Sequence, residues 1–305
     1  MSSIEVRPFR RSDRDQLTAL VNAHAAAVVP GVSASVNAVL AQLERETGEF
    51  IVDPWVTERQ TLVAEQRQRV VAAAHLLRYG SDDRVGESYR GSGEIRWFLF
   101  WPEAPYWPDS ADAGDALAAA CVAQLDRWGV SRQYADGALP VLGVYGVPEQ
   151  WPHVRATYER AGFVHGGRVE IVFVADVARL PRLGDPPLVD LAIRRSVGIN
   201  GTRLSAVLGE EVAGFVEVDT NLEDAVRLAR LGGWADIGNL LVVEEHRRRR
   251  IGTWLVAHAA EWLRLARVER LLAYATPDEL EAIAFLGSVG FGELTRTARG
   301  WERSG

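Results

Sequence analysis

The feature that most constrains the fold is the stretch from Leu240 to Leu255, which reads LLVVEEHRRRRIGTWL. Its first four residues are apolar, as in a buried strand, and apolar residues recur at helical spacing from Leu255 onward. Between these parts lies a short basic turn, Arg247 to Arg250, followed by Gly252. The stretch therefore predicts a strand, a glycine-containing turn and a helix in direct succession.

This arrangement suits an anionic ligand. The first amide groups of a helix have no partner inside the helix, and the helix dipole adds partial positive charge at the same end. A small residue at Gly252 lets a phosphate approach the backbone closely. A solvated basic turn is the alternative interpretation. Cations at a helix N-terminus oppose the dipole, however, so that interpretation gives little reason for four arginines.

The net charge of −7 and the single cysteine exclude several function classes. An acidic chain is a poor general binder of nucleic acid, and one cysteine, Cys121, allows neither an intrachain disulfide nor a cysteine-cluster metal site. The sequence also lacks an apolar run near the roughly 18 residues of a membrane helix, and its N-terminal residues hold no apolar signal segment. We therefore expect a soluble, cytoplasmic protein with no metal, nucleic-acid or membrane partner.

A weak internal repeat predicts two related domains. Residues 157–168 read TYERAGFVHGGR and residues 285–296 read FLGSVGFGELTR, and each predicts a helix, a Gly-Phe pair and then a strand. The second copy begins 128 residues after the first, which is about the length of a small domain. Prolines and a glycine in residues 176–190 break regular structure between them. We therefore predict tandem domains at residues 1–180 and 181–305.

The apolar patterns predict a mixed α/β sheet in each half. In the first half we expect strands at 4–9, 61–66, 70–79, 94–100, 139–145 and 169–174, and helices at 13–27, 33–45, 111–128 and 153–161. In the second half we expect strands at 191–194, 203–208, 211–218, 237–243, 271–275 and 292–299, and helices at 252–266 and 279–289. The second half therefore lacks the two leading helices of the first.

The basic turn fits neither of two common phosphate-binding motifs. A Rossmann fingerprint needs G-x-G-x-x-G, and a P-loop needs a lysine, which this chain does not contain. The turn resembles instead the acyl-CoA-binding turn of the GNAT superfamily of N-acetyltransferases, [RQ]-x-x-G-x-[GA] after the fourth strand. Arg247 and Gly252 match this pattern, and Arg250 stands where the family usually has glycine.

Two further segments carry the same resemblance. The opening residues, IEVRPFRRSDRDQLTALVN, resemble the first strand and helix of a GNAT domain, and Phe163 and Phe291 match its last motif. The resemblance implies two tandem GNAT-like domains, each a mixed, mostly antiparallel twisted sheet flanked by helices. It also implies acetyl-CoA as co-substrate, with its pyrophosphate on the turn and its pantetheine arm along the preceding strand. The residues implied in binding it are Leu241, Val242, Val243, Arg247, Arg248, Arg249, Arg250, Ile251, Gly252 and Thr253.

The first half differs at the equivalent turn. Aligning the two helices places Gly114 opposite Gly252, and the preceding positions hold Asp109 and Asp112, with Asp115 following. Carboxylates at a helix start complement the dipole but repel a pyrophosphate. We therefore expect the first domain to be degenerate for CoA binding.

Acetyl transfer requires a neutral amine, and family members often use a carboxylate or histidine near the start of the fourth strand as the base. Asp236 occupies that place, and Glu217 and His246 are alternatives. A residue that merely ends a turn is the other interpretation of Asp236. General acid–base help of this kind contributes about 10²–10⁴-fold to the rate.

The general acid is less evident. Many family members protonate the departing thiolate with a tyrosine on the helix before the Gly-Phe pair; that place holds Tyr158 in the first half and Leu286 in the second. Tyr274 is a candidate acid, although an aromatic residue in a strand also serves packing. The alternatives are Tyr158 donated from the first domain, or departure of CoA without an acid.

The missing helices leave the acceptor cleft of the second domain incomplete, so the first domain, the linker or a second chain in a homodimer must complete it. The acidic balance mildly favours a small cationic amine as acceptor, with a peptide N-terminus or a protein lysine as alternatives. We expect an N-acetyltransferase. The alternative is a catalytically silent acyl-CoA-binding sensor or scaffold, which Leu286 and Arg250 support.

Overall fold

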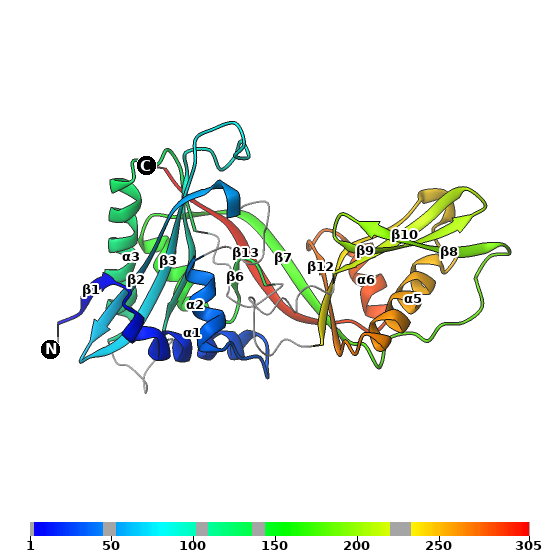
Figure 1. Cartoon of the computed structure of the whole chain (residues 1–305), viewed down its shortest axis with the longest axis horizontal. Coiled ribbons are helices and arrows are strands. Elements are labelled where there is room, and N and C mark those ends of the chain that lie inside the picture. The colour runs from blue at the N-terminus through cyan, green and yellow to red at the C-terminus, as the bar shows by residue number, and fades with distance from the viewer. Residues whose placement is uncertain (1–2, 45–52, 102–108, 136–143, 220–232, 305) are drawn as a thin grey trace. The chain divides into compact units, whose positions relative to one another are not determined.

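The computed structural model describes residues 3–44, 53–101, 109–135, 144–219 and 233–304 (Figure 1). By packing, these residues form two units. The first contains the described residues up to Val169 and those from Thr295 onward, and the second contains those from Glu170 to Leu294. The predicted boundary between residues 180 and 181 stays a prediction, because packing does not locate the start of a sequence repeat.

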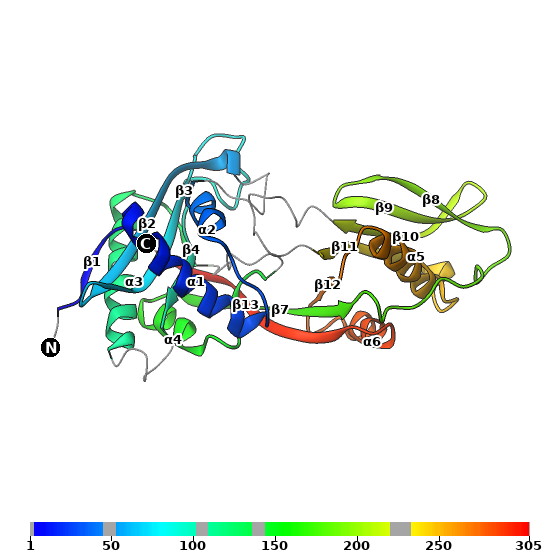
Figure 2. The same ribbon diagram turned by 60° about the horizontal axis from the view of Figure 1, so that its bottom comes forward.

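The first unit is a mixed sheet with helices on both sides. Figures 1 and 2 show α3 on one side of it and α1 with α2 on the other. β3 reads VVAAAHLL from Val70 to Leu77, and all eight of these residues are buried, as expected for a central strand covered on both faces. The elements are β1 (Glu5–Pro8), α1 (Arg14–Val28), α2 (Val36–Glu44), β2 (Val56–Gln66), β3 (Arg69–Tyr79), β4 (Gly93–Phe100), α3 (Ser110–Arg127), β5 (Gln133–Tyr134), β6 (Val147–Pro148) and α4 (Pro152–Arg160).

Neighbouring strands from β1 to β4 are antiparallel, and β4 and β5 are parallel. We predicted a strand at 139–145. Residues 139–143 lie outside the described residues, and the strand observed beside β4 is β5, only two residues long.

The second unit is a smaller sheet with the strand order β8-β9-β10-β11-β12-β7. All of these neighbours are antiparallel except β11 and β12, which are parallel. Helix α5 packs on β9, β10 and β11. Its buried residues include Ile251, Leu255, Ala259 and Leu263, which recur every four residues along one face. The elements are β8 (Leu191–Gly198), β9 (Gly201–Leu208), β10 (Glu211–Asp219), β11 (Trp234–Val242), α5 (Ile251–Leu265), β12 (Arg270–Ala275) and α6 (Leu280–Ser288).

Two long strands, β7 (Val164–Asp176) and β13 (Gly292–Arg303), contain the last predicted strand of each half. We expected these strands at residues 169–174 and 292–299. From Ile171 onward β7 pairs with β12, and from Thr297 onward β13 pairs with β5 and β6. Both strands are longer than predicted, and their pairing was not predicted, because an apolar pattern identifies a strand but not the strand edge it joins.

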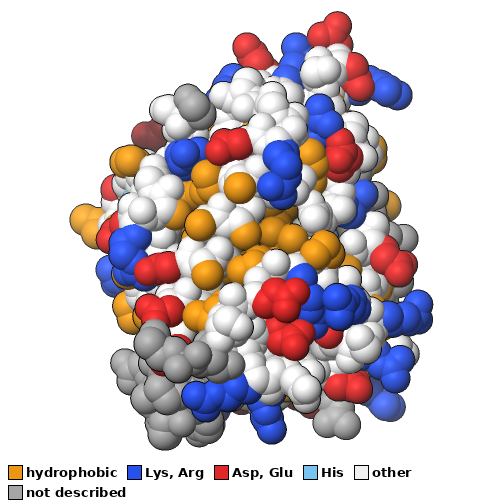
Figure 3. All heavy atoms as spheres, turned by 90° about the vertical axis from the view of Figure 1, so that its left-hand side faces the viewer, with side chains coloured by type: hydrophobic (Ala, Val, Ile, Leu, Met, Phe, Trp, Pro, Cys, Tyr) orange, Lys and Arg blue, Asp and Glu red, His pale blue; other side chains and the backbone are white. Residues whose placement is uncertain are grey.

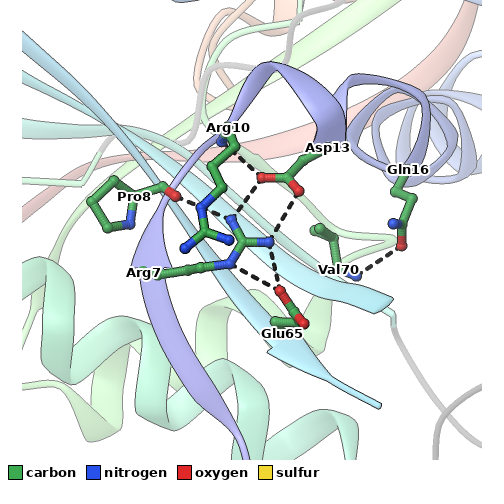
Figure 4. Close-up of polar contacts among 7 residues, drawn as sticks. All are labelled: Arg7, Pro8, Arg10, Asp13, Gln16, Glu65 and Val70. Atoms are coloured by element: carbon green, nitrogen blue, oxygen red, sulfur yellow. Dashed lines mark hydrogen bonds and ion pairs between the residues drawn. The ribbon is translucent and has the colours of Figure 1, made fainter. Parts of the chain in front are cut away.

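A buried ion cluster fixes the start of the first unit (Figure 4). Both terminal nitrogens of Arg7 donate to the carboxylate of Asp13, at 2.7 and 3.0 Å, and Arg7 also donates to Glu65 at 2.6 and 2.9 Å. Burial would raise the pKa of Asp13, but hydrogen bonds from Arg7 and the backbone of Arg10 outweigh it and hold that pKa below its ordinary value. The cluster therefore ties β1 to β2 and to the turn before α1.

Within the described residues, we find no helix that is both long enough and apolar enough to cross a membrane.

Candidate functional site

Strands β11 and β12 separate partway along their length. They pair at only three positions, from Trp234 with Arg270 to Asp236 with Leu272. β11 continues to Val242 and stays paired with β10, but the pairing between these two strands slips between Glu217 and Val218. Because of this slip, Gly238 is opposite no residue of β10 and forms a β-bulge. A β-bulge bends the strand that contains it.

A cleft of about 650 Å³ opens where the strands separate. Its walls come from β11, β12, the basic turn, the start of α5 and helix α6. Of the predicted binding residues, the cleft is lined by Leu241, Val242, Arg247, Arg248, Arg250, Ile251, Gly252 and Thr253, whereas Val243 and Arg249 do not line it. The structure therefore brings most of the predicted residues to one cavity.

The start of α5 presents unused backbone donors. The first backbone hydrogen bond of the helix runs from the amide of Trp254 to the carbonyl of Arg250, at 3.0 Å. Among the described residues, the amides of Ile251, Gly252 and Thr253 have no backbone acceptor, and no side chain caps the helix. These groups suit an anionic ligand.

The turn adopts a conformation that glycine tolerates better than arginine. Arg250 has φ 62° and ψ 9°, and Arg248 has φ 62°, both in the left-handed region. For a residue with a side chain this conformation costs about 1–2 kcal/mol. Arg250 thus keeps the backbone shape that a glycine would give and adds a guanidinium to the cleft wall.

Gly252 also has a packing role. A Cβ atom at this position would lie 3.2 Å from two ring carbons of Phe285 on α6. A glycine therefore lets α6 pack close to the start of α5, in addition to the close phosphate approach for which we predicted it.

Two arginines of the turn have partners in the cleft walls. Arg247 donates from Nε to the carbonyl of Val242 at 3.1 Å. Arg248 pairs with Glu281 of α6 at 2.7 Å, and both side chains are more than three-quarters exposed. An exposed pair of this kind contributes at most about 1 kcal/mol, so a ligand phosphate can compete with Glu281 for Arg248.

The structure brings the two predicted catalytic residues together. The hydroxyl of Tyr274 donates to Oδ2 of Asp236 at 3.4 Å, and both residues are half-buried. Tyr274 lines the cleft, whereas Asp236 does not. Asp236 is therefore linked to the cleft through the tyrosine.

Glu217, one of the alternative bases, has another role. It is fully buried and accepts hydrogen bonds from Arg203 at 2.7 Å and from Asn239 at 2.9 Å. Burial would raise the pKa of Glu217, but these hydrogen bonds outweigh it and hold that pKa below its ordinary value. Glu217 thus holds the side chain of Asn239, a cleft residue that our sequence reasoning missed. The sequence feature that could have identified Asn239 is its position as a polar residue directly before the apolar run that starts at Leu240.

His246, the other alternative base, lies in the cleft wall, with Nε2 3.6 Å from Glu211. Leu286 is buried and also lines the cleft. Tyr158 is fully buried in the first unit, where its ring packs against Phe98, Phe163 and Trp301. Donation of Tyr158 to the second domain does not fit these contacts.

The corresponding region of the first unit is filled. A Cβ atom on Gly114 would lie 3.0 Å from the ring of Phe100, and Asp109 accepts a hydrogen bond from Gln66 at 2.9 Å. The rings of Phe100 and His153 lie 4.7 Å apart, and those of His24 and His153 lie 5.7 Å apart. Burial lowers the pKa of both histidines to about 4. That the first domain is degenerate for CoA binding stays a prediction.

Residues 185–291 match the family model described as Acetyltransferase (GNAT) family, and this stretch includes every residue of the cleft. This stretch of the chain is therefore a GNAT domain. Proteins of this family are acyltransferases.

Known proteins agree with this assignment. The chain is 28% identical over 65 residues to YobR, an uncharacterized N-acetyltransferase of Bacillus subtilis (strain 168); the match covers 21% of this chain and only 26% of YobR. A tandem GNAT protein from the clavulanic acid biosynthesis pathway superposes with a TM-score of 0.64 at 16% identity, covering 98% of this chain and 97% of that one. A glucosamine N-acetyltransferase region of a fungal multi-domain GH3 β-N-acetylglucosaminidase also gives 0.64, at 15% identity, covering 99% of this chain and 38% of that one. The structural likenesses show the fold, which is two GNAT-like domains in tandem.

Proposed function

We propose that the chain transfers an acetyl group from acetyl-CoA directly to the primary amine of a small cationic acceptor. One observation carries this proposal: the cleft between β11 and β12 has the unused amides of α5 at its wall. The edge of β11 can hold the pantetheine arm that ends in the thioester. The free amides at the start of α5 can hold the phosphates of CoA. Catalysis would then consist mainly of positioning the thioester and the amine.

In this proposal the pantetheine arm lies along Leu241 to Val243 and the pyrophosphate contacts the turn from Arg247 to Thr253. Backbone amides of β11 would polarise the thioester carbonyl. Arg248 would leave Glu281 for a phosphate, and Arg250 already faces the cleft.

Asp236 and Tyr274 can together carry the protons that move in this reaction. The amine nitrogen attacks the carbonyl carbon, the carbon–sulfur bond breaks, and the amine loses a proton as the thiolate gains one. Asp236 would take the amine's proton through water, and Tyr274 would give its proton to the thiolate. The hydrogen bond between them then lets the proton on Asp236 return to Tyr274.

The acceptor class rests on two considerations. The chain carries a net charge of −7, which favours a cation over an anion. A protein of similar fold is described as a glucosamine N-acetyltransferase region, and an amino sugar is a small molecule with a primary amine. Amino sugars are therefore a sensible first group of acceptors to test.

A second candidate function is a catalytically silent acyl-CoA-binding sensor or scaffold. Leu286 favours it, because a buried leucine stands where the resemblance calls for a tyrosine. Free-thiol release from acetyl-CoA across a panel of amines distinguishes the two functions. Turnover on any amine, reduced in Asp236→Asn, supports the transferase. CoA binding without turnover on any amine, in both wild type and Asp236→Asn, supports the sensor.

We also propose that the protein acts in the cytoplasm, without a metal, nucleic-acid or membrane partner. A homodimer is one way to complete the acceptor cleft. Light scattering of the purified chain, with and without CoA, tests this: a mass twice that of the 33.6 kDa chain supports a dimer.

A further inference from the structure

The second unit contains another hollow, a groove of about 770 Å³ at the C-terminal end of α5. It lies between the end of β7, the residues that follow β7, the last turn of α5 and the start of β12. Helix α5 has 15 residues and is therefore about 22 Å long, which separates this groove from the cleft at the other end of the helix. Five arginines line the groove: Arg179, Arg182, Arg264, Arg267 and Arg270.

The groove has an excess of positive charge. Two carboxylates, Asp176 and Glu269, also line it, and Glu261 reaches its arginines from α5. Five guanidinium groups thus face three carboxylates in a chain whose net charge is −7. By contrast, the face of the first unit seen in Figure 3 mixes acidic and basic side chains around an apolar centre.

The helix dipole explains only part of this collection. Arginines at the C-terminal end of α5 complement its partial negative charge, which accounts for Arg264 in the last turn and for Arg267 just beyond it. It does not account for the other three, which come from β12 and from the segment after β7. Arg267 also has φ 59°, at the position after a helix where glycine is usual.

One donor in the groove lacks a partner. The terminal nitrogens of Arg264 donate to Glu261 and to the carbonyl of Leu180, both at 2.8 Å. Its Nε is buried and has no hydrogen-bond partner among the described residues. Arg264 is thus held in place by two hydrogen bonds and contributes a fixed positive charge to the groove wall.

We propose that this groove binds a small polyanion that carries two or more phosphate groups. Planar guanidinium groups match phosphate oxygens in pairs. The volume falls in the range of sites for small ligands, about 300–1,000 Å³. The net charge of −7 opposes a long polyanion such as nucleic acid. This site is independent of the acetyl transfer proposed above.

Calorimetric titration with inorganic tripolyphosphate tests the proposal. Because tripolyphosphate can also occupy the donor turn, the titration is done in the Arg248→Ala/Arg250→Ala background, where we expect one remaining site. Adding Arg182→Ala and Arg267→Ala should weaken that site at least about tenfold, the effect of losing two charged donors. Both of these side chains are exposed, so the fold should tolerate their loss.

The matched control adds Arg194→Ala and Arg195→Ala instead. These arginines are exposed on β8, outside the groove, and their loss changes the net charge equally. The control should bind tripolyphosphate as the background does. Three results would overturn the proposal: no site in the background, equal weakening in the control, or unchanged binding without Arg182 and Arg267.

Discussion

The hydroxyl of Tyr274 donates a hydrogen bond to Oδ2 of Asp236, which connects a carboxylate outside the cleft with a hydroxyl inside it. Asp236 is the last residue of β11 that pairs with β12, and Tyr274 lies two residues beyond its partner Leu272. The two residues thus meet where the strands begin to separate. This contact is the basis of the proposed proton route.

If Asp236 and Tyr274 act through that contact, their substitutions should not be additive. Asp236→Asn should lower kcat/KM about 10²–10⁴-fold with little change in KM, because the base acts in the transition state. Tyr274→Phe should lower kcat, and adding it to Asp236→Asn should have little further effect. Steady-state kinetics of the two single variants and the double variant measure this, with Tyr145→Phe in the first unit as a control. Fully multiplicative losses would show that the residues act separately.

Arg250 should affect stability and donor binding in opposite directions. Arg250→Gly relieves a left-handed arginine, and after the entropy cost of glycine we expect unfolding free energy to rise by up to about 1 kcal/mol. The same change removes a guanidinium from the cleft wall, so the Kd for acetyl-CoA should increase. Thermal unfolding and calorimetry measure the two effects.

Arg249→Gly is the matched control for that pair of effects. Arg249 lies next to Arg250 but is not among the residues with positive φ, and it does not line the cleft. Glycine there should lower the Tm and leave the Kd for acetyl-CoA unchanged. If Arg250→Gly also lowers the Tm, the strain assigned to Arg250 is absent.

Arg7 should stabilise the first unit through two carboxylates. Arg7→Met leaves Asp13 buried without its partner, and breaking a buried pair in this way costs about 3–5 kcal/mol. Because the pKa of Asp13 is lowered in the folded protein, its contribution is present above about pH 4 and disappears as pH falls through the folded pKa. The difference between Arg7→Met and wild type should therefore be larger at pH 7 than at pH 3. Urea unfolding at both pH values measures it, and an equal difference at both would be inconsistent with this assignment.

Buried histidines should make the first unit sensitive to mild acid. The folded pKa of His24 is lowered to about 4, so between that value and the ordinary value of about 6.5 the unfolded chain binds more protons. Stability should therefore decrease as pH falls from 6.5 to 4. His24→Leu should reduce this slope, with the half-buried His165 changed to leucine as a control. Urea unfolding at pH 7, 5.5 and 4 tests the expectation, which fails if both variants keep the wild-type slope.

The local elements of the site could be predicted because their signals are local. An apolar run, four arginines and an amphipathic repeat follow one another between Leu240 and Leu263, and they form the end of β11, the turn and α5 as expected. Asp236 and Tyr274 could be named from their strands, but their contact depends on the pairing of β11 with β12. Sequence periodicity carries no information on that pairing.

Other features required the three-dimensional structure. The contact between Gly252 and Phe285 joins two helices, and the role of Asn239 depends on a buried glutamate of the neighbouring strand. The pairing of β7 with β12 was missed for the same reason, since a strand pattern does not specify its partner.

The most direct test of the central claim is a crystal structure of the chain with CoA bound. Our account predicts one CoA in the second unit, with its pyrophosphate on the amides of Ile251, Gly252 and Thr253 and its pantetheine arm along Leu241 and Val242. It also predicts that Phe100 keeps the equivalent region of the first unit closed. CoA bound in the first unit, or absent from the cleft at saturating concentration, would contradict the account.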